Sequence, residues 1–285
     1  MPRATARADG VPVVPELPEV ETTRRGIASQ VTGRVVTAFD LHEARLRWPV
    51  PRSLGPAIVG ARIIEVRRRA KYLLVALEGS RTLLLHLGMS GNLRVLPADL
   101  PRLKHDHFDL RLDSGATLRF NDPRRFGSLH LIEGDTATHP LLRDLGPEPL
   151  ESAFDAQYLW QAARARRLAA KPFLMNAKVV VGVGNIYASE ALFCAGIRPG
   201  RQARRLKREE IDRLVAAVKT VLSKAVEVGG TTLRDYVGAD GAPGYFRQQL
   251  FVYERAGEPC HRCGSTIRQR VQAQRSTYWC TQCQR

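Results

Sequence analysis

Short stretches of alternating apolar and polar residues fill the first half of the chain, from Val35 to Ile132. In the clearest one, FDLRLDSGATLRF, apolar side chains recur at every second position and Ser114-Gly115 separates two runs. Successive strand residues point to opposite faces of a sheet, so the pattern predicts an antiparallel hairpin. The stretch KYLLVALEGSRTLLLHLGMSG predicts another, turning at Glu78-Gly79-Ser80. We therefore expect a β-sandwich or barrel, led by a helix from about Pro18 to Gln30.

Beyond about Pro147 the pattern changes to one typical of helices. Three stretches are rich in helix-forming residues: FDAQYLWQAARARRLAA, NIYASEALFCAGI and KREEIDRLVAAVKTVLSKAVEVG. They predict a helical second domain. A Gly/Pro-rich loop, Gly238 to Gly244, separates it from a short C-terminal unit. The expected fold class is α+β and multidomain, with a β-sandwich domain at 15–146, a helical domain at 147–245 and a small unit at 246–285.

Four of the five cysteines lie in this last unit. Cys260 and Cys263 form one C-x2-C pair and Cys280 and Cys283 form another, with sixteen residues between the pairs. Each pair presents two thiolates from one turn, and a hairpin between them would complete a tetrahedron, so the spacing predicts one structural Zn²⁺. The alternative is two disulfides. Cys194 is expected to be a small buried side chain.

The chain of 285 residues carries a formal net charge of +16, which favours a polyanionic partner such as nucleic acid. Of its 44 basic residues 37 are arginine, a bias that also fits a GC-rich genome. No run approaches the roughly 18 uninterrupted apolar residues of a membrane span. The first fourteen residues lack the apolar segment of a secretory signal. We expect a cytoplasmic, nucleoid-associated protein that has no contact with membranes.

Eight motifs carry a resemblance that covers nearly all of the chain from Pro15 onward. In order, they are PELPEVETTRRG, RRRAKYLL, HLGMSG, KHDHFDL, FNDPRRFG, VGVGNIYASEALF, DGAPGYF and QRSTYWC. Together they resemble bacterial formamidopyrimidine-DNA glycosylase. The resemblance implies a helix-two-turn-helix element in the helical domain and a zinc-finger hairpin at 246–285. It also implies a monomeric enzyme that excises oxidised purines, such as 8-oxoguanine and formamidopyrimidines, from double-stranded DNA and then cuts at the abasic sugar by β,δ-elimination.

In that family the nucleophile is the amine of an N-terminal proline, and the matching residue is Pro15. A secondary amine can attack the sugar C1′, expel the base and form an iminium, whereas an amide nitrogen within the chain is inert. We therefore expect residues 1–14 to be absent from the working enzyme, with translation starting at the codon of Val14 read as methionine. A removed extension, or a protein without lyase activity, are the alternatives.

The resemblance assigns three further catalytic residues. Glu16 would be the acid/base for sugar ring opening, whereas Glu19 and Glu21 fit an ordinary first helical turn. Lys71, at a predicted hairpin tip, would donate a proton during elimination. Arg275, on the zinc hairpin, would contact a phosphate and assist the second elimination.

Extrusion of a damaged base leaves a gap in the duplex, and the family fills it with side chains that match Met89, Arg124 and Phe126. Strand-end packing is the alternative for Met89 and Phe126. The other expected DNA contacts are His105, Arg167, Lys171 and Asn185. Gly182 and Gly184 would let backbone amides approach a phosphate, and Asn185 would also suit a plain helix N-cap.

Two positions depart from the family pattern: Gln274 replaces a glycine before Arg275, and Ala242 stands where some relatives carry lysine. Two alternatives for function remain. An endonuclease VIII-like glycosylase would act on oxidised pyrimidines, and a non-enzymatic zinc-ribbon protein would only bind DNA.

Overall fold

The computed structural model describes residues 14–229 and 250–285. Residues 1–13 and the loop that contains Ala242 lie outside the described residues. Two four-stranded antiparallel sheets form the first half of the chain, with the strand orders β1-β6-β7-β5 and β2-β3-β4-β8. Their bounds are β1 Val36–Leu41, β2 Ile63–Arg69, β3 Tyr72–Leu77, β4 Arg81–His86, β5 Asn92–Pro97, β6 Asp106–Leu112, β7 Ala116–Asn121 and β8 Ser128–Glu133.

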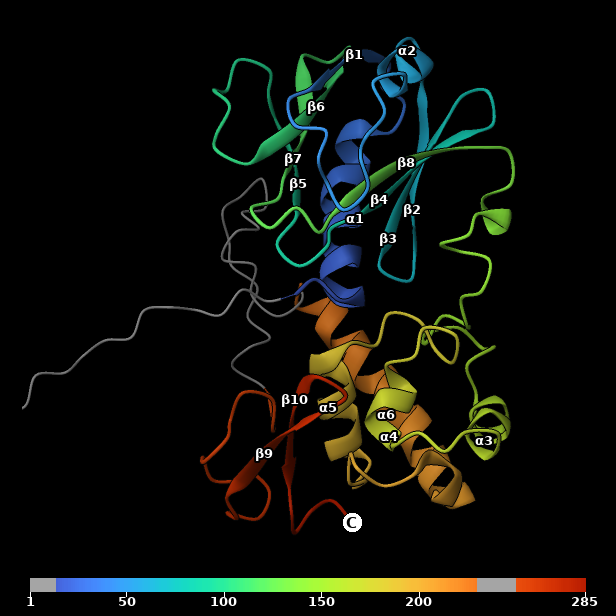
Figure 1. Cartoon of the computed structure of the whole chain (residues 1–285), viewed down its shortest axis with the longest axis vertical. Helices are drawn as coiled ribbons and strands as arrows, with labels where there is room; N and C mark the ends of the chain where they lie inside the picture. The colour runs from blue at the N-terminus through green and yellow to red at the C-terminus, as the bar shows by residue number, and fades with distance from the viewer. Residues whose placement is uncertain (1–13, 230–249) are drawn as a thin grey trace, which may run out of the picture.

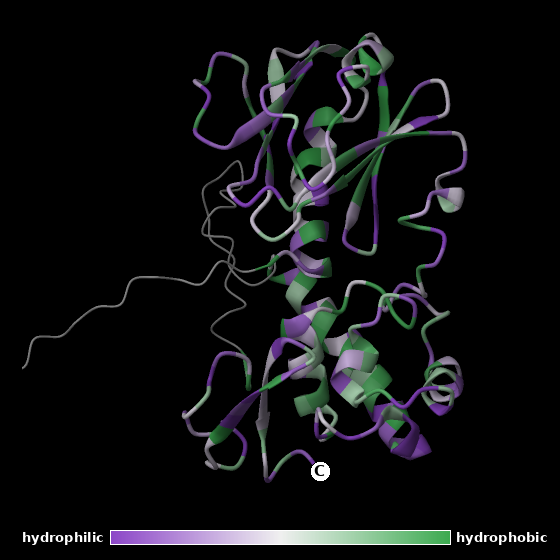
Figure 2. Ribbon diagram, in the orientation of Figure 1, coloured by the Kyte–Doolittle hydropathy of each residue, from purple (hydrophilic) through white to green (hydrophobic). Residues whose placement is uncertain are grey.

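The expected hairpins are confirmed. Strands β3 and β4 pair in register from Tyr72↔His86 to Leu77↔Arg81, and β6 pairs with β7 across the turn at Ser114-Gly115. The apolar faces of the two sheets enclose one core, which includes Leu73, Leu85, Phe108 and Phe120. Figure 2 shows peripheral loops that are mostly hydrophilic around this interior.

Helix α1, Leu17–Val31, connects the two halves of the molecule. Its apolar side chains Val20, Ile27 and Val31 belong to the core of the sandwich, and the helix also contacts α6 of the second domain. In Figure 1 it runs along the long axis from the sandwich toward the helical domain. The N-terminal end of α1 therefore lies where the two domains meet.

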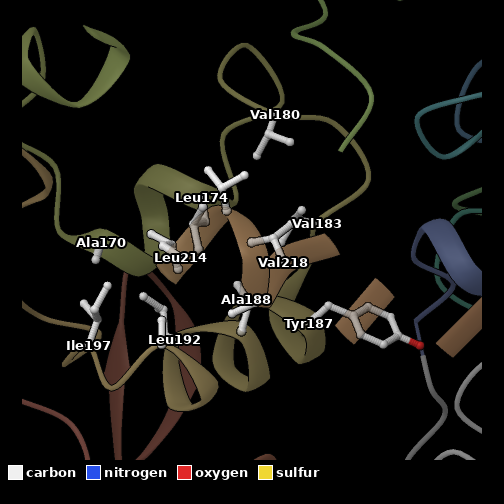
Figure 3. Close-up of a cluster of buried hydrophobic side chains, with 14 of the residues drawn as sticks. Ala170, Leu174, Val180, Val183, Tyr187, Ala188, Leu192, Ile197, Leu214 and Val218 are labelled. Carbon is white, nitrogen blue, oxygen red and sulfur yellow. The ribbon is translucent and has the colours of Figure 1, made fainter. Parts of the chain in front are cut away.

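The second domain is helical, as expected. Its helices are α3 Ala156–Arg164, α4 Ala170–Leu174, α5 Asn185–Cys194 and α6 Arg208–Glu227, with the short helix η2 Ala203–Arg205 between α5 and α6. The short helices α2 Leu54–Ile58 and η1 Thr136–Thr138 precede this domain in the chain. The first predicted helical stretch is interrupted, since α3 ends at Arg164 and α4 begins only at Ala170. The Arg164 guanidinium donates a hydrogen bond to the Leu206 carbonyl. Figure 3 shows the buried cluster of this domain, from which the Tyr187 ring extends away toward α1.

The C-terminal unit is a hairpin of β9, Ile267–Gln272, and β10, Arg275–Cys280. It packs against α5 through an apolar cluster that includes Phe193, Val252 and Ile267. Within the described parts of the chain no helix is both long enough and apolar enough to cross a membrane. The domain boundary expected at 146/147 stays a prediction, and the one at 245/246 lies outside the described residues.

Candidate active site

A cavity of about 280 Å³ lies where the N-terminal ends of α1 and α5 meet. All three units of the chain contribute to its walls, so it exists only in the assembled fold. Its lining residues are Val14, Glu16, Lys71, Met89, Arg124, Met175, Gly184, Asn185, Ile186, Tyr253, Glu254 and Arg275. The structure thus gathers six of the expected site residues in one place: Glu16, Lys71, Met89, Arg124, Asn185 and Arg275.

The Glu16 carboxylate is held by the N-terminus of α5. Its Oε2 accepts a hydrogen bond from Gly184 N at 2.8 Å, and its Oε1 accepts one from Ile186 N at 3.1 Å. The first amides of a helix have no partner within the helix and favour a negative charge, so they form an anion site. These amides therefore serve Glu16 rather than the phosphate we expected, and Asn185 is the first residue of the helix rather than its N-cap.

Burial raises the pKa of Glu16 above its ordinary value of 4.5, against the opposing effects of Lys71 and the α5 amides. Only 2% of the residue is exposed. Desolvation disfavours the ionised form, whereas the amides and the ammonium favour it. A buried carboxyl with a raised pKa is suited to donating and accepting protons in a reaction.

Glu19 belongs to the same buried network and is more than a residue of the first helical turn. Its Oε2 accepts from Glu16 N at 2.9 Å, and its Oε1 accepts from the Tyr187 hydroxyl at 2.7 Å. The tyrosine that leaves the helical core in Figure 3 thus reaches α1. This contact fixes the backbone beside Pro15 against the second domain. Sequence periodicity marks Tyr187 only as a core residue, so it was missed.

Pro15 directly precedes the carboxylate and is buried, with Val14 before it at the cavity wall. The next residue, Leu17, donates its amide hydrogen to Gly182 O at 3.2 Å. A side chain on Gly182 would collide with Leu17, where the built Cβ lies 2.5 Å from Cδ1. The glycine therefore permits the close approach of α1.

Lys71 lies in the two-residue turn between β2 and β3, as expected of a hairpin tip. Beside it is His86, whose pKa burial lowers to about 4, with further lowering by Lys71 and Arg47. The neutral imidazole accepts from Gly88 N through Nδ1 at 2.9 Å, which orders the turn before Met89. We did not single out His86 from the sequence, although it begins the motif HLGMSG.

The expected gap-filling residues lie on two loops that are fastened together by Asp122. This buried carboxylate accepts from Ser90 Oγ at 2.5 Å on one loop and from Gly127 N at 2.8 Å on the other. The Arg124 guanidinium stacks over the Phe126 ring at 5.2 Å, and 43% of Phe126 is exposed. An exposed aromatic ring on a rigid loop is available to enter a base stack. Simple strand-end packing does not explain that exposure.

Arg275 begins β10 and reaches the cavity from the zinc hairpin. The hairpin turn requires positive φ at both central residues, with 47° at Ala273 and 58° at Gln274. Such a turn favours glycine at the second position, so Gln274 occupies a backbone conformation that is uncommon for a residue with a side chain.

Besides Phe126, three expected DNA contacts are not part of the cavity lining. Arg167 is exposed between α3 and α4, and His105 precedes β6, where its carbonyl accepts from Asp122 N at 3.0 Å. Lys171 is only 1% exposed, and its ammonium donates to Ser276 O at 2.8 Å and to Thr277 Oγ1 at 3.0 Å. Burial lowers the pKa of Lys171 to about 8. Its position therefore supports a role in holding the zinc hairpin. The phosphate contact expected of Lys171 stays a prediction.

The segment that begins at Leu250 contributes Tyr253 and Glu254 to the cavity. It is anchored by Glu190 of α5, whose carboxylate accepts from Phe251 N at 2.7 Å, Val252 N at 3.0 Å and Tyr253 N at 2.9 Å. The Tyr253 hydroxyl also lies 3.4 Å from Asn185 Nδ2. No local pattern indicates such contacts, because they join residues more than sixty positions apart.

The four cysteines of the C-terminal unit converge, with every Sγ within 4.8 Å of the others. The Sγ atoms of Cys260 and Cys283 are 3.9 Å apart, and those of Cys263 and Cys280 are 3.4 Å apart. Four thiolates at about 2.3 Å from Zn²⁺ in a tetrahedron would be separated by about 3.8 Å. A disulfide would bring two sulfurs to about 2.05 Å. The geometry fits one structural zinc, and four thiolates leave no position for a catalytic water.

Family models match three segments of the chain. They are the formamidopyrimidine-DNA glycosylase N-terminal domain at 14–129, the H2TH domain of the same enzyme at 145–237, and the zinc finger found in FPG and IleRS at 257–285. The chain is also similar to curated proteins called formamidopyrimidine-DNA glycosylase. The one from Thioalkalivibrio sulfidiphilus is 58% identical and the one from Alkalilimnicola ehrlichii is 56% identical, each over 95% of this chain and 100% of the relative.

Solved structures agree with these matches over the same share of the chain. The MutM (Fpg) protein from Thermus thermophilus superposes with a TM-score of 0.85 at 43% identity, over 95% of this chain and 98% of that one. A complex between Lactococcus lactis Fpg and DNA containing FAPY-dG gives 0.87 at 32% identity, over 95% and 100%. The assembled cavity, the zinc cluster and these similarities lead to one conclusion: the chain belongs to the formamidopyrimidine-DNA glycosylase family.

Proposed function

We propose that this protein excises oxidised purines from duplex DNA and then cleaves the strand at the abasic sugar. The observation that carries the proposal is the placement of Glu16. A buried carboxyl with a raised pKa directly follows Pro15, and Lys71 and Arg275 line the same cavity. The Lactococcus relative, which was solved with FAPY-dG DNA, supports this class of substrate. Each residue role below is part of the proposal.

The Pro15 nitrogen forms a bond to C1′ of the damaged nucleotide while the bond from C1′ to the base breaks. The base leaves with the electron pair and takes up a proton. The ammonium formed at Pro15 then loses its proton. Glu16 protonates the ring oxygen as the sugar opens, and the freed nitrogen lone pair forms an iminium. Loss of a 2′ proton expels the 3′ phosphate, and a second elimination expels the 5′ phosphate. Lys71 and Arg275 supply protons and positive charge for these steps.

The chemistry requires a free amine on Pro15, which a preceding Val14 would block. We propose that the working enzyme begins at Pro15. Two facts support this: the first family match begins at residue 14, and the curated relatives align over their whole length with 95% of this chain.

DNA would lie across the exposed Arg124 and Phe126 with Met89 beside them, and the charge of +16 would draw it there. Arg167, His105 and Asn185 are proposed as further contacts. The protein would act as a monomer, associated with the nucleoid. The zinc hairpin would hold Arg275 at the cavity. A ribbon that only binds DNA would not need an arginine in that place.

Borohydride trapping tests the proposal. A protein that begins Met-Pro15, with the methionine removed, should form a covalent adduct with duplex containing 8-oxoguanine opposite cytosine. The 285-residue chain, with its N-terminus verified by mass spectrometry, should not. Undamaged duplex is the control for both proteins. Trapping by the intact chain would refute Pro15 as the nucleophile, and trapping only with an oxidised pyrimidine would favour the endonuclease VIII-like alternative.

A further inference from the structure

One buried carboxylate holds the turn that carries Lys71. Glu148 comes from the segment between β8 and α3, and only 7% of the residue is exposed. Its Oε1 accepts from Ala70 N at 2.7 Å and from Arg69 Nη1 at 2.9 Å, and its Oε2 accepts from Arg68 Nη1 at 2.7 Å. Three consecutive residues directly before Lys71 thus converge on one side chain far away in the sequence.

The turn needs this support because its backbone is unusual. Arg69 pairs with Tyr72, so Ala70 and Lys71 alone form the loop, and Ala70 adopts a φ of 55°. Positive φ is uncommon for a residue with a Cβ, and surrounding contacts must maintain it. The Ala70 amide is buried and finds its acceptor in Glu148 rather than in the strand ladder. Loss of that acceptor would leave a buried donor without a partner.

The segment that bears Glu148 is also connected, through a second loop, to Glu16. The amide of Gly146 donates to Ala177 O at 2.8 Å, and Val181 N donates to Pro147 O at 3.2 Å. The segment that bears Glu148 is therefore bonded to the loop that runs into Gly182 and Gly184. That loop contacts the start of α1 and the Glu16 carboxylate. Arg69 adds a bond from Nη2 to Gly146 O at 2.6 Å.

Stability alone is a weak account of this cluster. Buried ion pairs contribute little net stability, because the desolvation of the charges offsets their attraction. The bonds of the cluster are also concentrated at the Lys71 turn and its neighbours. Arg68 donates to Ala70 O at 2.9 Å within the turn and to the Glu21 carboxylate of α1 at 3.3 Å. Its contacts fix the Lys71 turn relative to both α1 and the second domain.

We propose that Glu148 is a positioning residue that sets the place of Lys71 relative to Glu16. The inference rests on the proposed function, in which Lys71 acts on the damaged nucleotide. Glu148 itself is buried behind the turn and touches no substrate. It acts by holding the turn backbone, so that the ammonium enters the cavity in one arrangement.

A double-mutant cycle tests the proposal in the enzyme that begins at Pro15. Glu148→Gln keeps the size of the side chain but removes the charge that three donors share. We expect it to slow single-turnover excision from 8-oxoguanine duplex by about 10- to 100-fold, the scale for displacement of a reacting group by up to about 1 Å. In a Lys71→Gln background the same change should slow the reaction by no more than about twofold, because coupled residues are not additive.

Asp144→Asn is the matched control. This carboxylate lies on the same segment but is exposed and pairs only with Lys178, at 3.3 Å, so its loss should leave the rate unchanged. Zinc content and melting temperature report whether each variant is folded. If Glu148→Gln does not fold, Arg69→Lys carries the same test. Lysine keeps the charge but replaces the two guanidinium nitrogens that bond separately to Glu148 and Gly146 by a single nitrogen.

Equal slowing by Glu148→Gln in both backgrounds would show a purely structural role and overturn the proposal. So would a wild-type rate for Glu148→Gln beside a slow Lys71→Gln enzyme, and in that case the proposed function would stand. A wild-type rate for Lys71→Gln would instead refute the role of Lys71 in the proposed function, and this inference with it.

Discussion

Replacing Gly184 with alanine would place a methyl group against the Glu16 carboxylate. A Cβ built on Gly184 lies 2.5 Å from Oε2 and closer still to Oε1 and Cδ. The backbone itself would tolerate alanine, because φ is −108° and ψ is −155°. The substitution therefore tests the position of one catalytic group without straining the chain.

The size of the effect follows from the overlap. An ordinary contact needs 3.4 Å or more, so the carboxylate or the start of α5 would have to move by about 1 Å. A misplacement of that size costs about 100-fold in rate, or about 3 kcal/mol in the activation barrier. The overpacking should also lower the stability of the fold by about 1–3 kcal/mol.

Single-turnover excision by the enzyme that begins at Pro15 measures this effect, with thermal unfolding measured in parallel. Gly200→Ala is the control, since its Cβ would meet only the end of the exposed Arg270 side chain, which is free to move away. We expect a near wild-type rate for this control. A Gly184→Ala enzyme that is folded and excises at the wild-type rate would refute the assignment of Glu16 and the geometry that supports it.

Two further results are expected. Cys280→Ser should release zinc and greatly weaken DNA binding while the sandwich stays folded, because the ribbon is a separate unit; a protein that contains no zinc before mutation would contradict this. The pKa of His86 is lowered from 6.5 to about 4, so protonation favours the unfolded state and the stability present above pH 6.5 is lost as the pH falls toward 4. His86→Asn keeps an acceptor for Gly88 N and serves as the comparison. Urea unfolding at about pH 7 and about pH 5 should show that the free energy of unfolding of wild type falls by roughly 2 kcal/mol more than that of this variant. Equal decreases would refute the buried neutral imidazole.

The sequence by itself determined the features whose causes are local. Alternation of apolar residues predicted the β6–β7 hairpin, because a strand directs every second side chain to the core. Two apolar runs on either side of the turn signal Glu78-Gly79-Ser80 predicted the β3–β4 hairpin. Cysteine spacing likewise determined the metal ligands, since each C-x2-C pair brings two thiolates together within one turn. The end of α3 at Arg164 was missed, because residues of good helix propensity continue beyond it to Ala170.

Only the tertiary structure decided how the site is built. Glu16 meets Gly184 across 168 positions of sequence, and Glu148 meets Ala70 across 78. No sequence periodicity or motif spacing indicates either contact. Both contacts form only when the two domains pack together around α1. The same packing buries Lys171 beneath the zinc hairpin, where desolvation lowers the pKa of its ammonium. From its sequence context we expected this lysine to face a phosphate. The sequence specified which side chains were available for chemistry, and the packing of the domains specified their partners.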